Sequence, residues 1–192
     1  MMKFRTIKEA KFVQIPELPQ SLVIEFKALE KIVKSGSGSA VSKLNKIFAL
    51  TDKITTLIAP YMVCEKGCSH CCKIDVYMTS VEAQYIHKNL DIAPTTGHSL
   101  TSGHGQAKRP CTFLDNTGAC AIYEYRPFSC RTYFTLDNPM FCKDIEVEHI
   151  SYTSTSNGLL YKLLELTAYI NAKQPIRDVR DFFPSGIIAK GK

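Results

Sequence analysis

Four cysteines lie within nine residues of this chain, in the stretch Cys64-Glu-Lys-Gly-Cys68-Ser-His-Cys71-Cys72. Zinc in proteins takes four soft donors in a tetrahedron, and closely spaced cysteines joined by longer loops supply them readily. Iron-sulfur clusters use the same thiolates at comparable spacings, so the donors alone do not decide between zinc and iron. The stretch therefore predicts a metal centre and leaves the metal open.

The other four cysteines follow in the next seventy residues, and neither end of the chain has any. We expect all eight to be metal ligands: Cys64, Cys68, Cys71, Cys72, Cys111, Cys120, Cys130 and Cys142. Consecutive side chains point in different directions in both helix and strand, so Cys71 and Cys72 do not easily bind one ion. Two sites, or one site plus a spare thiol, follow from this pair.

A few other side chains belong to the same neighbourhood, while no residue stands out as catalytic or as an organic cofactor ligand. His70 lies inside the cluster and could ligate the metal or hydrogen-bond a thiolate. Basic residues flank the cysteines and could offset thiolate charge: Lys66, Lys73, Arg126 and Arg131. Three further histidines are more often surface residues than metal ligands: His98, His104 and His149.

Length and composition favour one domain in a reducing compartment. A chain of 192 residues can bury a core without covalent cross-links. The N-terminus lacks a signal-peptide pattern, and no apolar run approaches the roughly 18 residues of a membrane span. We therefore expect a cytoplasmic protein with no membrane partner, in which clustered cysteines are metal ligands rather than disulfides. The expected single domain has an N-terminal helical part (1–60), a cysteine-cluster core (61–143) and a C-terminal helical part (144–192).

The formal charge of +6 does not by itself indicate nucleic-acid binding. Eight thiolates on two divalent ions would lower this charge to about +2. The lysines are also spread through the first half of the chain, as on a solvated face, rather than collected in a run. We expect no nucleic-acid partner, and the sequence leaves an unidentified protein partner open.

Apolar periodicity predicts the helices that must hold this cluster. One helix is expected from a cap at Ser21 to Val33, and a second over residues 40–59, after a Ser-Gly corner at 35–39. Thr79-Ser-Val-Glu82 is a capping box that opens a helix to about Leu90. A last helix is expected over residues 156–172, with a short helical tail at 175–183.

The remaining segments predict irregular structure with little sheet. The two prolines that end residues 1–19 favour an extended arm. Short strands are expected at 73–78 and 147–152, and a hairpin at 111–120 with a cysteine on each arm. Residues 91–110 form a long polar loop, and a helical turn is expected at Arg126-Pro127. The fold class is α+β and predominantly α-helical, with helices packed around a cysteine-rich metal-binding core and a small β-hairpin.

Three motifs in order give the chain a family resemblance. They are Cys-x₃-Cys-x₂-Cys-Cys, then Cys111-Thr-Phe-Leu-Asp with Gly118-Ala-Cys120-Ala-Ile-Tyr, then Arg126-Pro127-x-x-Cys130-Arg131. Residues 61–143 thereby resemble the bacterial CxxCxxCC cysteine-cluster proteins, although the first gap here is one residue longer. The resemblance implies zinc or iron chelation by eight cysteines. One branch is similar to flagellin lysine methylases that use S-adenosylmethionine, but this chain has no glycine-rich cofactor loop after a strand.

These observations leave three functions open. In the leading hypothesis the metal, zinc or an iron-sulfur cluster, is structural, and the function resides in a surface that binds a partner. The alternative is an iron-sulfur redox protein or enzyme, working in electron transfer or methylation-linked chemistry, with residues 91–110 as a lid. A third hypothesis is a thiol redox sensor or metal chaperone that uses an uncommitted cysteine of the Cys71-Cys72 pair.

Overall fold

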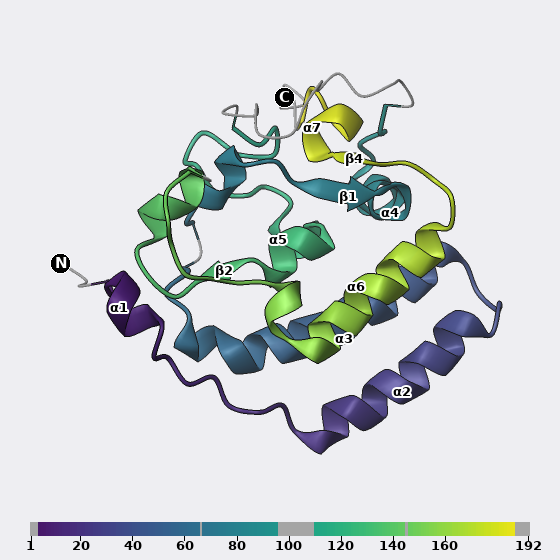
Figure 1. Ribbon diagram of the computed structural model, residues 1–192. Coiled ribbons are helices and arrows are strands. Elements are labelled where there is room, and N and C mark those ends of the chain that lie inside the picture. The colour runs from purple at the N-terminus through teal and green to yellow at the C-terminus, as the bar shows by residue number, and fades with distance from the viewer. Residues whose placement is uncertain (1–3, 66, 96–109, 145, 187–192) are drawn as a thin grey trace.

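The computed structural model describes residues 4–65, 67–95, 110–144 and 146–186. It confirms a mostly helical α+β fold (Figure 1). The helices are α1 (Ile7–Ala10), α2 (Gln20–Lys34), α3 (Ala40–Ile58), α4 (Ser80–Leu90), α5 (Phe128–Thr132), α6 (Gly158–Asn171) and α7 (Val179–Phe182). The strands are β1 (Tyr77–Thr79), β2 (Phe134–Thr135), β3 (Ser151–Tyr152) and β4 (Ile176–Asp178), and short 3₁₀ turns lie between them.

Helix α3 is the centre of the molecule, because α2, α4, α5 and α6 all pack against it (Figure 1). Ser39 begins it by accepting a hydrogen bond from the Ser42 amide, as an N-cap residue does. Apolar residues at helical spacing then fill the first hydrophobic core, among them Leu44, Ile47 and Ile54, which have no exposed surface. The predicted helix over residues 40–59 is thus confirmed.

The N-terminal region differs from prediction in two details. Helix α2 begins at Gln20 with Pro19 as its N-cap and no side-chain cap, so the expected cap at Ser21 is wrong. The arm before it is not extended throughout, because a capping box between Thr6 and Glu9 forms one helical turn, α1. Figure 1 shows the arm running from α1 to the start of α2.

The sheets are small and join distant parts of the chain. Strand β1 pairs antiparallel with β4, and β2 pairs antiparallel with β3. The predicted hairpin at 111–120 is reduced to one bridge, Leu114–Cys120, around a turn in which Asp115 accepts backbone hydrogen bonds. The expected strands are shorter than predicted, and the first half of the expected helical tail is strand β4.

A second hydrophobic core lies beside the first. It gathers β1, α4 and α7 around apolar residues that include Met78, Ile86, Phe113 and Phe182. Cys111 and Cys120 pack against this second core, so the cysteine-bearing loops are anchored in it. No helix in the described ranges is both long and apolar enough to cross a membrane.

Candidate metal centre

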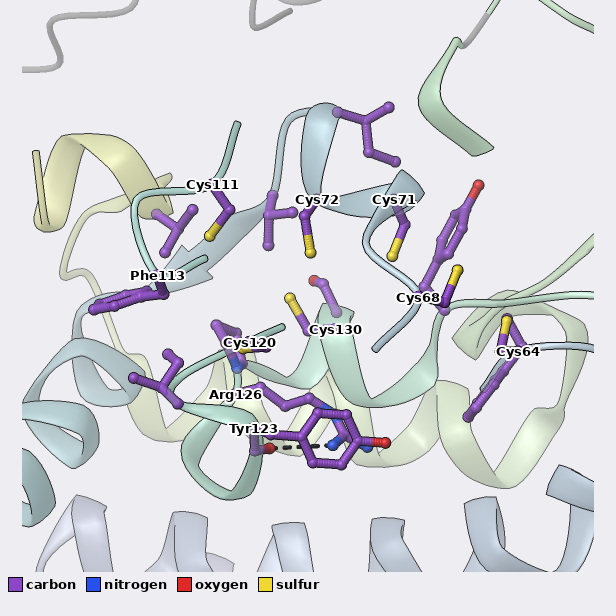
Figure 2. A pocket seen from close by; sticks show the side chains of 18 of the residues that line it. Cys64, Cys68, Cys71, Cys72, Cys111, Phe113, Cys120, Tyr123, Arg126 and Cys130 are labelled. Carbon is purple, nitrogen blue, oxygen red and sulfur yellow. Dashed lines mark hydrogen bonds between the residues drawn. The ribbon is translucent and has the colours of Figure 1, made fainter. Parts of the chain in front are cut away.

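Seven of the eight cysteines line one pocket of about 290 Å³. They are Cys64, Cys68, Cys71, Cys72, Cys111, Cys120 and Cys130 (Figure 2). The eighth, Cys142, is buried in a 3₁₀ turn, Pro139–Lys143, which packs against the turn His70–Lys73. The fold therefore brings the cysteines of four separate segments to one place, although whether they bind a metal stays a prediction.

The turn His70–Lys73 carries the two neighbouring cysteines, Cys71 and Cys72. The Cys72 amide bonds the Ser69 carbonyl at 3.0 Å, which winds this stretch tightly. Successive side chains of such a turn point in different directions. In Figure 2 the Cys72 thiol points toward Cys130, whereas Cys71 lies on the side of Cys68. The side chains of Cys71 and Cys72 still share a hydrogen bond.

Cys72 belongs to one side of the pocket, which we call the second cysteine set: Cys72, Cys111, Cys120 and Cys130 (Figure 2). The Cys111 amide donates to the Cys72 carbonyl at 2.8 Å, which joins the two segments. The Leu114–Cys120 bridge brings Cys120 back beside Cys111. Helix α5, which begins right after Pro127, carries Cys130.

The first cysteine set comprises Cys64, Cys68, Cys71 and Cys142. Two of its members contact the fully buried Thr135 on β2. The Thr135 amide donates a hydrogen bond to the Cys64 sulfur at 3.3 Å. The Cys142 side chain also hydrogen-bonds Thr135, and Tyr133 bonds Cys142. In Figure 2 the labelled members of this set, Cys64, Cys68 and Cys71, lie on the side of the pocket away from Cys111 and Cys120.

Burial favours the protonated form of three of these thiols, those of Cys111, Cys130 and Cys142. It raises the pKa of Cys111 to about 11 and that of Cys142 to about 12, and it raises the pKa of Cys130 well above the ordinary value. Neighbouring thiols add to these shifts: Cys64 and Cys68 act on the pKa of Cys142, as Cys111, Cys72 and Cys120 do on that of Cys130. A bound metal would displace the protons and take their place.

The donor chemistry fits a thiophilic metal, but metal binding requires the sulfur atoms to move closer together. Within the described ranges no group of three or more His, Cys, Asp or Glu side chains is arranged to hold a metal ion. A protonated thiol carries no charge and is a poor ligand. Loss of the protons would therefore accompany convergence of the sulfur atoms on the metal.

The histidines divide between the site and its surroundings. His70 Nδ1 is buried with no hydrogen-bond partner in the structure, and burial lowers the pKa of the His70 ring. His149 is not a surface histidine, because its side chain is only 12% exposed and its Nε2 lies 3.2 Å from the Tyr133 hydroxyl. His98 and His104 fall outside the described residues, as do Lys66 and residues 96–109 of the expected loop.

The two predicted arginines have different positions. Arg126 lines the pocket, with its guanidinium 3.8 Å from the centre of the Tyr123 ring and a hydrogen bond to the Tyr123 carbonyl (Figure 2). Arg131 does not line the pocket. Its guanidinium forms two hydrogen bonds to Asp52 of α3, at 2.8 and 2.7 Å, and others to backbone carbonyls. Arg131 thus holds α5 against α3.

Arg180 is the residue near the site that the sequence did not indicate. It is 5% exposed and pairs with buried Asp178 through two contacts of 3.0 Å. Its other terminal nitrogen donates to the carbonyls of Cys72 and Ile74, at 3.1 and 3.2 Å. Asp178 in turn accepts from the Val76 amide at 2.7 Å. The ion pair therefore fixes the backbone that follows Cys72, from more than one hundred residues away in sequence.

Comparisons with known proteins agree with this site. No curated protein and no solved structure was found to match the chain. Residues 63–154 match the model of a family described as "CxxCxxCC: Putative zinc- or iron-chelating domain". All eight cysteines lie inside the matched range. The cysteine-rich part of the chain is thus similar to the CxxCxxCC family, whose description is zinc or iron chelation.

Proposed function

We propose that the eight cysteines bind zinc or an iron-sulfur cluster in this pocket. The supporting observation is that seven thiols line one pocket and the eighth is held beside it through Thr135. The family description of the matched segment, zinc or iron chelation, supports the same chemistry. The thiols come from separate segments, so a metal bound to them would join those segments as a cross-link does.

The metal's role in this proposal is structural. The stretches that carry the cysteines contain only short 3₁₀ turns, one isolated bridge and the five-residue helix α5. Such stretches gain little from backbone hydrogen bonding, so a metal would supply much of their stability. A four-thiolate zinc site leaves no open coordination position, and the biological function would then lie in binding a protein partner.

One observation favours an iron-sulfur redox function as the second candidate. Besides the thiols, the pocket is lined by apolar and aromatic side chains such as Phe113, Ile122 and Tyr123. Its volume of about 290 Å³ is near the lower limit for small-ligand sites and is larger than the volume of a single metal ion. A cluster there could exchange electrons or meet a small substrate, including one for methylation-linked chemistry.

Metal analysis of protein purified with and without oxygen tests both candidates. A structural zinc site predicts zinc in both preparations and no visible absorption. A redox cluster predicts iron, acid-labile sulfide and visible absorption that air destroys. Cys130→Ser should lower the metal content, whereas Ser129→Ala, which alters the neighbouring pocket residue without removing a soft donor, should leave it unchanged. Metal-free protein that binds neither metal after reconstitution would refute the proposal.

A further inference from the structure

We propose that the eight cysteines form two adjacent metal centres of four thiols each, and that the boundary between them falls between Cys71 and Cys72. One centre is the first cysteine set and the other is the second cysteine set. This inference rests on the proposed function and specifies how the ligands divide. It predicts two centres per chain.

The second cysteine set is joined by backbone contacts that do not involve the first. Cys72 and Cys111 are tied by the hydrogen bond between the Cys111 amide and the Cys72 carbonyl. Cys120 returns beside Cys111 through the one-bridge turn. Figure 2 shows the thiols of these residues and of Cys130 directed toward a common space. Four soft donors around one space are the number that a tetrahedral zinc site or a cubane cluster requires.

The first cysteine set is organised around a different residue, Thr135. Its amide meets the Cys64 sulfur, and the Cys142 side chain hydrogen-bonds the same threonine. The turn that carries Cys142 packs on the turn that carries Cys71. Cys68 completes the set, since in Figure 2 it lies beside Cys71 and Cys64 and away from Cys111 and Cys120.

The neighbouring pair explains why two centres are needed. One tetrahedral ion cannot take eight thiolates, and in Figure 2 Cys72 lies toward Cys130 whereas Cys71 lies toward Cys68. If one of them were a spare thiol, its set would hold only three cysteines. With one cysteine of the pair in each set, both sets have four cysteines. The turn His70–Lys73 then contributes one ligand to each centre.

Partial metal removal from the unmodified chain tests the division. The protein is loaded with Zn²⁺ without oxygen, about half of the zinc is withdrawn with a chelator, and exposed thiols are alkylated and mapped by mass spectrometry. We expect two zinc ions per chain and alkylation of the four cysteines of one set together. Random alkylation across the two sets, or a single zinc per chain, would overturn the division. No zinc binding at all would instead refute the proposed function.

Two matched double variants place the boundary. Cys71→Ser with Cys142→Ser removes two donors from the first set, so one Co²⁺ per chain should bind with unchanged affinity and tetrahedral thiolate absorption. Cys72→Ser with Cys142→Ser removes one donor from each set, so no Co²⁺ should bind with the original affinity. Equal Co²⁺ binding by the two variants would contradict the proposal. The alkylation experiment decides the question if either variant fails to fold.

Discussion

Gly186 lies against the backbone of Thr112, the residue that follows Cys111. Its φ of +57° is one that side chains rarely adopt, and a Cβ there would lie 1.8 Å from the Thr112 carbonyl oxygen. The Thr112 carbonyl cannot be displaced cheaply, because it belongs to the backbone. Because Gly186 has no side chain, its backbone can approach Thr112, the residue next to the predicted metal ligand Cys111.

Gly186→Ala should therefore destabilise the protein and weaken its metal binding. We expect the free energy of unfolding to fall by about 1–3 kcal/mol, the usual cost of overpacking, with positive φ adding to it. Chemical denaturation measures this loss, and zinc titration measures the affinity. Gly158→Ala is the control, since nothing lies within 4 Å of that position and alanine favours the helix. Equal effects of the two substitutions would contradict the role given to Gly186.

Among the elements, α5 depends on Arg131 for its place beside α3. The guanidinium joins Asp52 through two hydrogen bonds and lies 4.2 Å from the centre of the Phe48 ring. A planar, forked group makes these contacts together, which an ammonium cannot do. Cys130 precedes Arg131 on the same helix, so the contact also positions one thiol of the second cysteine set.

Arg131→Lys should lower the free energy of unfolding by about 1.5–3 kcal/mol, because charge-assisted hydrogen bonds of a buried side chain are lost. Thermal or urea unfolding measures the change. The exposed pair of Lys53 and Glu25 on α3 and α2 offers a comparison. Lys53→Ala should cost less than about 1 kcal/mol, as exposed ion pairs do. A lysine variant as stable as the original would show that charge alone is sufficient at this position.

The helices could be predicted because their signals are local. The capping box at Thr79 and Glu82 begins α4 as expected, and the apolar spacing of α3 identifies its buried face. Strand β4 could not be predicted, since its three residues become a strand only by pairing with β1, about one hundred positions earlier. A distant contact also places Arg180 beside Cys72, and His149 lies within hydrogen-bond distance of Tyr133. The role of the cysteines as metal ligands was predicted from their type and spacing alone, and this role stays a prediction.

For the whole molecule, removal of metal should destabilise the cysteine-bearing stretches more than the helices α2, α3 and α6. Helices α2, α3 and α6 share a continuous apolar core and do not depend on the thiols. The cysteine-bearing stretches consist mainly of short turns and loops that pack against the second core, so we expect their order to depend more on a bound metal. Metal that binds only the folded state at 100 times its dissociation constant adds about 2.7 kcal/mol of stability.

Hydrogen exchange measures this difference along the chain. After chelation, amides in residues 67–74 and 110–126 should exchange much faster, whereas those of α3 should keep most of their protection. Re-addition of zinc or reconstitution of a cluster should restore the slow exchange. A uniform increase over both regions would mean that the metal supports the whole fold rather than its cysteine-rich part.

The ion pair of Arg180 and Asp178 lies outside the segment that matches the family model, yet it holds the backbone beside Cys72. The matched segment ends at residue 154, yet the Cys72 carbonyl is bound by Arg180, and strand β1 is paired with residues 176–178. Residues 63–154 moved alone into another protein would keep every cysteine and lose both contacts. The contacts that hold the cysteine-bearing segments therefore extend beyond the matched segment, and a transplant that keeps them must include the C-terminal residues through Gly186.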